Sequence, residues 1–353
     1  MRDPASQAIA ERRDAIAAAV VEAQFRRWPE LFARYGDAGR VKCVEDLRFH
    51  VLYLAEAVGA DSPALFCAYA GWVKVLFAGL RIPVEDLAGS LTILRDVVEE
   101  MVGGVAAKRT AACVAAALDA LPAVTVDPPS FIAAEGPHAG LASAYLDALV
   151  AGDRRRATRL VLDGVEGDAL GVREAYLHVF QPVLREIGRL WQTGQISVAH
   201  EHFATAATQG VMSMLYPRIF AAARTGRSLV ATCVSGELHE IGVRMVADFF
   251  EMAGWDTYYL GANVPARSVA AAVEERNAPV LAVSATITAH VGAVAEMIDA
   301  VRQAVGARPL CVIVGGYPFN IEPDLWKAVG ADASAADAAG AVATAERLMA
   351  EAP

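Results

Sequence analysis

The sequence predicts a multidomain protein in which two all-helical parts precede a doubly wound parallel α/β sheet. Three observations support this fold class. Apolar residues recur with the helical period across residues 8–121 and again across 139–224, without the alternation of a strand. A segment rich in proline and glycine, residues 122–138, separates these two stretches. After Gly226, short β-rich runs alternate with helical segments, which is the pattern of a parallel sheet.

The composition fits a globular protein with two or three domains. The chain has 353 residues, of which 55% are hydrophobic and 20% are charged. Its 31 Lys and Arg residues and 41 Asp and Glu residues give a formal net charge of -10, which argues against nucleic-acid and anionic-membrane partners. The 5 cysteines include no Cys-x-x-Cys pair, so neither a disulfide framework nor a structural zinc site is indicated. With no recognisable membrane span or signal-peptide core, we expect a cytoplasmic protein.

The bounds of the two helical parts follow from their helical periodicity and from residues typical of helix starts and linkers. We expect a helical sensor domain at residues 1–125, in which Ser62 and Pro63 have the character of a helix start. Residues 126–138 form the predicted linker. Residues 139–225 are expected to form an antiparallel four-helix bundle, with helices at 141–150, 153–163, 172–192 and 198–220.

Residues 226–353 are expected to form the α/β domain. Strands are predicted at residues 228–234, 257–260, 279–284 and 310–314, with a fifth near 331–333. Right-handed crossovers between them make a flavodoxin-like sheet the default, although the strand order cannot be deduced from the sequence. Ligands of such sheets bind at the carboxyl ends of the strands, which directs attention to the loops after Val234, Val283 and Val314.

The loop after the first strand holds a candidate metal ligand, His239. Glu237 can accept the proton of one ring nitrogen and leave the other nitrogen free for a metal, while Gly242 allows a bulky group to approach the backbone. Alone, such a pair is more typical of a hydrogen-bonded surface loop. The small residues Ser284-Ala-Thr286 and the glycines Gly315-Gly316 end two other strands, and the three loops together describe a slot for a ligand with a long tail.

These loops resemble the cobalamin-binding signature Asp-x-His-x-x-Gly, Ser-x-Leu, Gly-Gly. In this chain 41 residues separate Gly242 from Ser284 and 28 separate Thr286 from Gly315, as in the signature. The resemblance implies that His239, with Leu238 beside it, is the lower axial ligand of cobalt in a base-off, His-on corrinoid. It also implies that Ser284 and the wall of Gly315 and Gly316 enclose the dimethylbenzimidazole tail. Two residues depart from the signature, since Glu237 replaces Asp and Thr286 replaces Leu. Because Glu is one methylene longer than Asp, its hold on His239 is expected to differ.

A second set of candidate residues lies in the predicted bundle. Trp191 ends one helix while Glu201 and His202 begin the next, so the three can converge at one end of the bundle. An aromatic helix end beside solvated polar residues is the simpler interpretation. The pattern Trp-x9-Glu-His resembles light-sensing cobalamin proteins of the CarH type. The resemblance implies that Trp191 and Val198 pack on the 5′-deoxyadenosyl group of adenosylcobalamin, that Glu201 hydrogen-bonds it, and that His202 becomes the upper cobalt ligand after photolysis.

The first helical part is rich in aromatic residues, with His50 and several arginines among them. A helical core with a polar rim explains this composition. Because the part precedes a cobalamin module and has no basic recognition helix, the chain also resembles the photocobilins, whose helical domain is globin-like. That resemblance implies non-covalent biliverdin near His50, Tyr53 and Trp72. A haem held by His50 is an alternative.

Together these resemblances predict a non-enzymatic photoreceptor that binds adenosylcobalamin and biliverdin. Photolysis of the cobalt–carbon bond would change the axial ligation and the assembly of a homo-oligomer, which would signal to an unknown effector. The alternative is a corrinoid methyl carrier of a methyltransferase system, which also joins a helical bundle to this sheet. A third class, a subunit of an adenosylcobalamin mutase, requires a barrel that does not fit in this chain.

Overall fold

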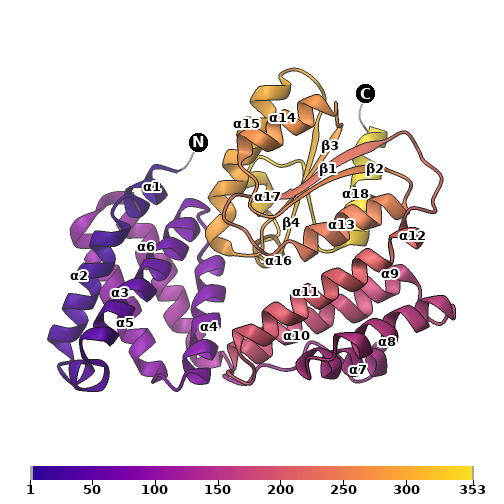
Figure 1. Ribbon diagram of the computed structural model, residues 1–353. Coiled ribbons are helices and arrows are strands. Elements are labelled where there is room, and N and C mark those ends of the chain that lie inside the picture. The colour runs from indigo at the N-terminus through magenta and orange to yellow at the C-terminus, as the bar shows by residue number, and fades with distance from the viewer. Residues whose placement is uncertain (1–2, 352–353) are drawn as a thin grey trace.

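Three parts make up the protein in a computed structural model that describes residues 3–351 (Figure 1). The N-terminal helices lie on one side of the molecule, the sheet and its helices on the other, and a second group of helices below the sheet. We call this second group, residues 139–214, the cap helices. They reach from the sheet to the C-terminal end of the helix labelled α4 in the N-terminal part.

The N-terminal part, as far as the structure describes it from residue 3 onward, consists of six α-helices and has no strand. They are α1 Pro4–Ala10, α2 Arg13–Arg27, α3 Glu30–Gly59, α4 Pro63–Gly79, α5 Val84–Met101 and α6 Gly104–Ala120, followed by the short 3-10 turn η1 Leu121–Ala123. The helical N-terminal region is therefore as predicted, while its likeness to a globin stays a prediction. Among residues 3–351, no helix combines the length and the apolar character that crossing a bilayer requires.

The cap helices pack against one another. Two of them depart from the predicted helix bounds, in each case next to a proline. They are α7 Ala139–Val150, α8 Arg154–Glu166, α9 Val172–Glu174, the π-helical turn η2 Ala175–Phe180, α10 Gln181–Gln192 and α11 Val198–Met214, with the short α12 Tyr216–Ile219 after them. The predicted helix 172–192 widens at η2, just before Pro182, which has no N–H to continue the ladder. The predicted helix 198–220 ends at Met214 ahead of Pro217 for the same reason.

The third part is a five-stranded parallel sheet with the order β2-β1-β3-β4-β5, which is the flavodoxin-like order. Its strands are β1 Ser228–Cys233, β2 Asp256–Gly261, β3 Val280–Ser284, β4 Cys311–Gly315 and β5 Ala333–Ala335. Between and after them lie α13 Ile241–Met252, α14 Ala266–Glu275, the 3-10 turn η3 Thr288–His290, α15 Val291–Val305, α16 Tyr317–Ile321, α17 Leu325–Ala328 and α18 Ala338–Glu351. The alanine-rich sequence after Gly330 carries little periodicity, so the sequence misplaced β5 by two residues and did not indicate α18.

Each face of the sheet shares a hydrophobic core with a different helical part. Alternate strand residues such as Val230, Val283 and Val312 belong to one buried cluster with α14, α15 and the N-terminal helices. Their neighbours, such as Leu229 and Ala282, belong to a second cluster with α13, α18 and the cap helices. The sheet domain therefore holds both helical parts through apolar burial, the dominant favourable term in folding.

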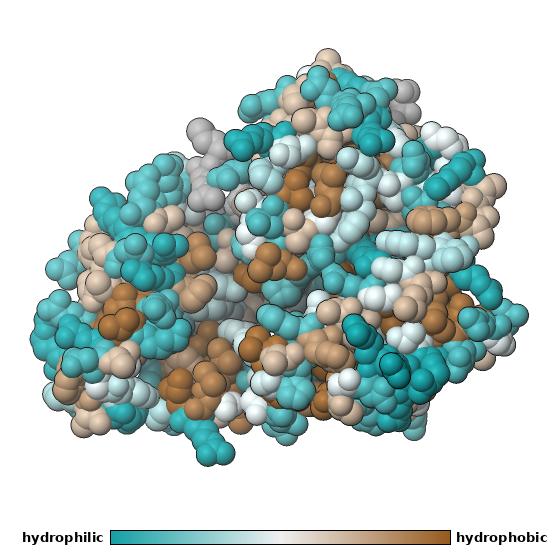
Figure 2. Space-filling model, in the orientation of Figure 1, coloured by the Kyte–Doolittle hydropathy of each residue, from teal (hydrophilic) through white to brown (hydrophobic). Residues whose placement is uncertain are grey.

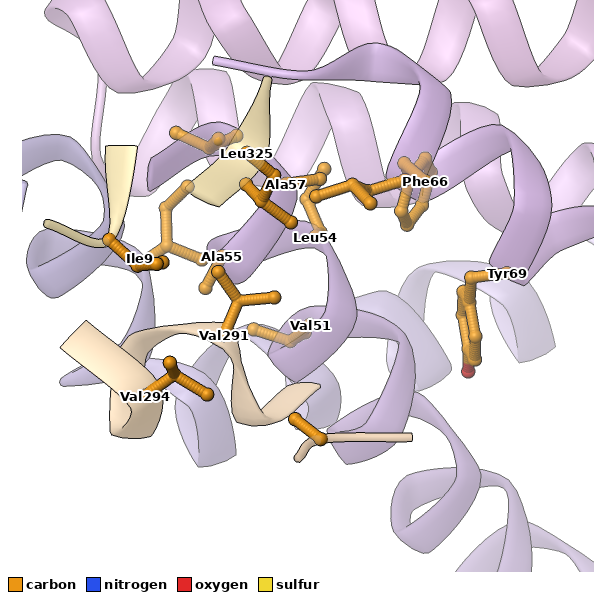
Figure 3. Close-up of a cluster of buried hydrophobic side chains, with 14 of the residues drawn as sticks. Ile9, Val51, Leu54, Ala55, Ala57, Phe66, Tyr69, Val291, Val294 and Leu325 are labelled. Atoms are coloured by element: carbon orange, nitrogen blue, oxygen red, sulfur yellow. The ribbon is translucent and has the colours of Figure 1, made fainter. Parts of the chain in front are cut away.

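Helix α3 docks on the start of α15 through this first cluster. Figure 3 shows Val291 and Val294 beside Val51, Leu54 and Ala55 of α3. Two polar contacts flank the apolar ones. The backbone N–H of Gly292 donates to Glu56 Oε2 at 2.7 Å, and Ser62 Oγ donates to Glu322 Oε2 at 2.9 Å. Ser62 precedes α4 as predicted, but its hydroxyl makes no cap hydrogen bond to its own helix and bonds the sheet domain instead.

His50 makes the N-terminal part sensitive to acid. Its side chain is buried, its Nδ1 lies 2.6 Å from the Tyr69 hydroxyl, and burial lowers its pKa from 6.5 to about 4. An unfolded chain therefore binds a proton here at a higher pH than the folded chain does. The neutral His50 therefore contributes about 3 kcal/mol to the free energy of unfolding above pH 6.5, and we expect this contribution to be lost as the pH falls toward 4. Urea unfolding at several pH values between 4 and 6.5 measures the free energy of unfolding. We expect His50→Asn to make this free energy depend less steeply on pH, and an equally steep dependence in the variant would contradict this account.

Candidate functional site

The carboxyl ends of three neighbouring strands lie level with one another. Cys233 of β1 pairs with Ser284 of β3, and Ser284 pairs with Gly315 of β4. The predicted loops after these strands therefore meet at one edge of the sheet. The edge includes the boundary between β1 and β3, where the strand order reverses and where doubly wound sheets bind their ligands.

His239 projects from this edge with one ring nitrogen occupied and the other open. Its Nδ1 donates to Glu237 Oε1 at 2.6 Å, its side chain is 56% exposed, and Nε2 has no hydrogen-bond partner among the described residues. The hydrogen bond to Glu237 raises the pKa of His239, burial opposes the rise, and the charges of Glu237 and Glu201 add to it. A neutral imidazole held by Nδ1 presents the Nε2 lone pair outward, as a metal ligand must.

Glu237 is a buried carboxylate that joins two loops. Its Oε1 accepts from His239, while its Oε2 accepts from the backbone N–H groups of Thr286 at 2.7 Å and Ile287 at 3.1 Å. Burial alone would raise the pKa of Glu237, but hydrogen bonds led by those of His239 and His290 hold it well below the usual range. The extra methylene of Glu relative to Asp explains the reach from the β1 loop to the β3 loop.

His290 completes this cluster, and sequence reasoning missed it. Its Nδ1 lies 3.1 Å from Glu237 Oε2, and its side chain is 19% exposed. Two imidazoles therefore bond opposite oxygens of one carboxylate. No motif spacing marks His290, because it stands on η3 outside the Ser-x-Leu segment. The only available signal was a histidine near the end of a predicted strand.

The glycines of the predicted slot differ in the space that a side chain would find at each position. A Cβ on Gly316, whose φ is 106°, would lie 2.0 Å from the carbonyl oxygen of Ala285, so the fold itself requires glycine there. A Cβ on Gly315 would lie 3.1 Å from the Ala335 carbonyl oxygen. At Gly242, nothing lies within 4 Å of an added Cβ, so the backbone beside His239 is open to a bulky group.

The cap helices bring their predicted residues to the same region. Ser197 and His200 hydrogen-bond each other at the start of α11, as expected for a helix start, and this turns His200 away. His202 Nδ1 hydrogen-bonds Glu201, and Thr205 Oγ1 donates to the other Glu201 oxygen at 3.2 Å. Gln209 of α11 donates through Nε2 to Glu240 Oε1 at 2.7 Å, so α11 lies against the loop that carries His239.

The N-terminal part borders the candidate site together with the sheet edge and the cap helices. The rings of Trp72 and Trp191 lie 6.1 Å apart, and Gln192 Nε2 donates to the Trp72 carbonyl at 2.8 Å. Burial, and then the charge of Glu237, raise the pKa of Tyr53 to about 12. Tyr53 stacks on Tyr69 with ring centroids 3.8 Å apart, so it belongs to the aromatic cluster around His50, whereas Trp72 faces the cap helices. The His50 ring is buried beside Tyr69, and its place next to a bilin or a haem stays a prediction.

Gly79 permits this close approach of α4 to the cap helices. An added Cβ would lie 2.6 Å from the Gln192 carbonyl oxygen, and the backbone there cannot move aside cheaply. We expect Gly79→Ala to separate Trp72 from Trp191, to lower the free energy of unfolding by about 1–3 kcal/mol, and to increase acrylamide quenching of tryptophan fluorescence. Gly188→Ala is the matched control, since nothing lies within 4 Å of its added Cβ. Quenching that is the same in Gly79→Ala and wild type would contradict this role.

Large apolar side chains stay exposed where the three parts meet. Leu238 is 72% exposed, Val198 53% and Trp72 40%, and Figure 2 shows apolar residues around this hollow. This arrangement would suit a large, flat ligand that contains a metal ion with one coordination site left for a protein side chain. Among the described residues no three His, Cys, Asp or Glu side chains gather as a metal site. A macrocycle that brings its own equatorial ligands needs only one imidazole, so the residues present fit such a group.

Comparisons with known proteins agree with this geometry. Two family models described as a B12 binding domain match residues 227–345 and 141–216. Dimethylamine corrinoid protein 1 of Methanosarcina acetivorans is 29% identical over 171 residues, which are 47% of this chain and 78% of that protein. Dimethylamine corrinoid protein 3 of Methanosarcina mazei is 28% identical over 171 residues, which are 47% of this chain and 100% of that protein. The monomethylamine corrinoid protein of Methanosarcina barkeri shares the fold, with a TM-score of 0.54 and 18% identity over 60% of this chain and 100% of that one.

The chain therefore carries a cobalamin-binding module, and its cofactor is a cobalt corrinoid. The predicted light sensor is wrong, because the relatives are named dimethylamine corrinoid proteins and favour the alternative that the sequence left open. Nothing in these similarities supports biliverdin or the CarH and photocobilin types. In the structure Glu201 and His202 hydrogen-bond each other and Trp191 lies beside Trp72, and the contacts predicted for them with a cofactor stay a prediction.

Proposed function

We propose that this protein is a corrinoid methyl carrier that serves a methyltransferase system. The observation that carries the proposal is the His239 ring, with Nδ1 held by a buried carboxylate and Nε2 open at the corrinoid edge of the sheet. The names of the dimethylamine corrinoid relatives support methyl transfer as the purpose of this ligation. In this role the chain is a component on which methyltransferases act, and it needs no catalytic residue of its own.

Most of the predicted corrinoid-site residues have a role in this proposal; the exceptions are Glu201 and His202. When bound, the corrinoid supplies a cobalt that accepts and releases a methyl group. His239 would ligate that cobalt through Nε2, Glu237 would orient the ring, and Leu238 and Gly242 would lie against the macrocycle. Ser284, Thr286, Gly315 and Gly316 line the place of the nucleotide tail. Val198 and Trp191 cover the upper face, and Trp72 buttresses Trp191.

A methyl group takes the place of the predicted adenosyl group on the upper face. Glu201 and His202 then have no adenosyl group to bind, and their mutual hydrogen bond occupies them. Self-association of the chain stays a prediction, which size-exclusion chromatography of the cobalamin-loaded protein measures.

Methyl transfer on the full chain tests the proposal. The protein is loaded with cobalamin, reduced under anaerobic conditions, and mixed with dimethylamine and a dimethylamine methyltransferase, or with methyl iodide as a direct donor. We expect the visible spectrum of protein-bound methylcobalamin to form, and the label of a ¹⁴C-methyl group to elute with the protein. A wild-type protein that binds cobalamin but takes up no methyl group from either donor would show that the proposal is wrong.

A further inference from the structure

His290 stands between the candidate cobalt ligand and the N-terminal part. Its Nδ1 meets Glu237 Oε2 at 3.1 Å, and the other oxygen of the same carboxylate holds His239 at 2.6 Å. The three side chains therefore form a line from η3 to the open Nε2 of His239. Glu237 is wholly buried, so its carboxylate has no water to replace a lost donor.

The donors on Glu237 Oε2 are not equivalent. Thr286 and Ile287 donate through backbone N–H groups, which the strand end holds in place. His290 donates through a side chain, which can adopt another rotamer or be substituted without breaking the backbone. Of the three donors on this oxygen, His290 is therefore the one through which the orientation of the carboxylate can be adjusted.

The N-terminal part determines where His290 lies. The turn η3 packs on α3, and the next residues, Val291 and Gly292, begin α15 against that helix (Figure 3). Glu56 Oε2 accepts from the Gly292 N–H at 2.7 Å, and an added Cβ on Gly292 would lie 2.8 Å from the same oxygen. The contact therefore depends on glycine at 292, two residues after His290.

We propose that His290 is a positioning residue for the lower cobalt ligand, and that α3 of the N-terminal part acts on cobalt ligation through it. The proposal rests on His239 as that ligand. Loss of the His290 hydrogen bond removes the one side-chain donor on Glu237 Oε2 and leaves only the backbone N–H groups of Thr286 and Ile287 there, so the carboxylate is held less firmly and His239 is less well aimed at the cobalt. Residues outside the two B12-binding matches thereby gain influence on the reactive centre.

The test observes the cobalt–histidine bond directly. The full chain, grown with ¹⁵N-histidine, is loaded with hydroxocobalamin and reduced to cob(II)alamin, and its electron paramagnetic resonance spectrum is recorded. An axial ¹⁴N nitrogen splits the cobalt lines into triplets, whereas ¹⁵N splits them into doublets. Wild type should show doublets, which establish the protein histidine as the ligand. Their absence in wild type would refute His239 ligation itself, which is a different failure from that of His290.

Four variants then test the positioning role. We expect His290→Ala to lower the ratio of His-on to His-off cobalt about tenfold, the low end of the effect of removing a residue behind a metal ligand. His290→Asn, whose amide can replace the Nδ1 donor, should restore most of it. Glu56→Ala should lower the ratio in the same direction, and Glu56→Gln, which keeps an acceptor oxygen, should not.

His178→Ala, a histidine of the cap helices outside this cluster, is the matched control. Thermal unfolding of each protein without cofactor separates loss of ligation from loss of the fold. A His290→Ala protein that melts like wild type and keeps the wild-type His-on ratio would overturn the role of His290. A Glu56→Ala protein with the wild-type ratio would overturn the action of α3.

Discussion

Replacing His239 with alanine should release the corrinoid. The substitution removes the one open imidazole at the sheet edge, while the exposed apolar residues and the tail region stay in place. Removing a residue behind a metal ligand typically costs about 10–100-fold in metal affinity, so loss of the ligand itself should cost at least about tenfold. Equilibrium dialysis with hydroxocobalamin measures the affinity, and the visible spectrum of the retained fraction reports the lower ligand.

His178→Ala and His202→Ala are the matched controls for this experiment. His178 lies in η2 within the cap helices, and His202 is an exposed residue whose ring nitrogen bonds Glu201. Both variants should retain cobalamin with the lower-ligand spectrum of wild type. If His239→Ala retained the red cofactor with an unchanged spectrum, the assignment of the cobalt ligand would fail, and the proposed methyl carrier would lose its central observation.

Replacing Glu237 with alanine should destabilise the protein even before the cofactor binds. The variant leaves the N–H groups of Thr286 and Ile287 without the acceptor that the buried Glu237 side chain supplies. Each unsatisfied buried donor costs about 1–3 kcal/mol, so we expect a loss of about 3 kcal/mol or more in the free energy of unfolding. Chemical denaturation of the protein without cofactor measures this loss.

Glu237→Asp separates the two tasks of this carboxylate. Aspartate keeps the acceptor that the cobalamin signature uses for its histidine, but it is one methylene shorter and should not reach the β3 loop. We therefore expect Glu237→Asp to lose stability and to retain most of the cobalamin affinity. Glu346→Ala, an exposed site on α18, should change stability by less than about 0.5 kcal/mol. A Glu237→Ala protein as stable as wild type would contradict the bridging role.

The two sequence patterns that suggested a function differ in how specifically they predict a binding site. The cobalamin signature combines three loops with matching spacings, and a parallel sheet brings those loops to one edge. The pattern around Trp191 comes from one helix end and the next helix start, which any helical hairpin places together. It predicts only that the three residues lie near one end of the cap helices, and such proximity does not specify what lies above the cobalt.

The sequence by itself determined the features that depend on neighbours within one element. Strand ends, helix starts and the pairing of His239 with Glu237 two residues earlier follow from local periodicity and loop chemistry. The level arrangement of Cys233, Ser284 and Gly315 follows as well, because parallel strands share one carboxyl edge.

Only the tertiary structure decided which distant elements touch. His290 lies 53 residues from Glu237, and Gln192 lies 120 residues from Trp72, so no periodicity links them. The fate of His50 was equally undetermined, because a helical face can bury a histidine or present it to a ligand. Contacts between elements depend on how apolar faces pack, and packing is a property of the whole fold, which local spacing does not encode.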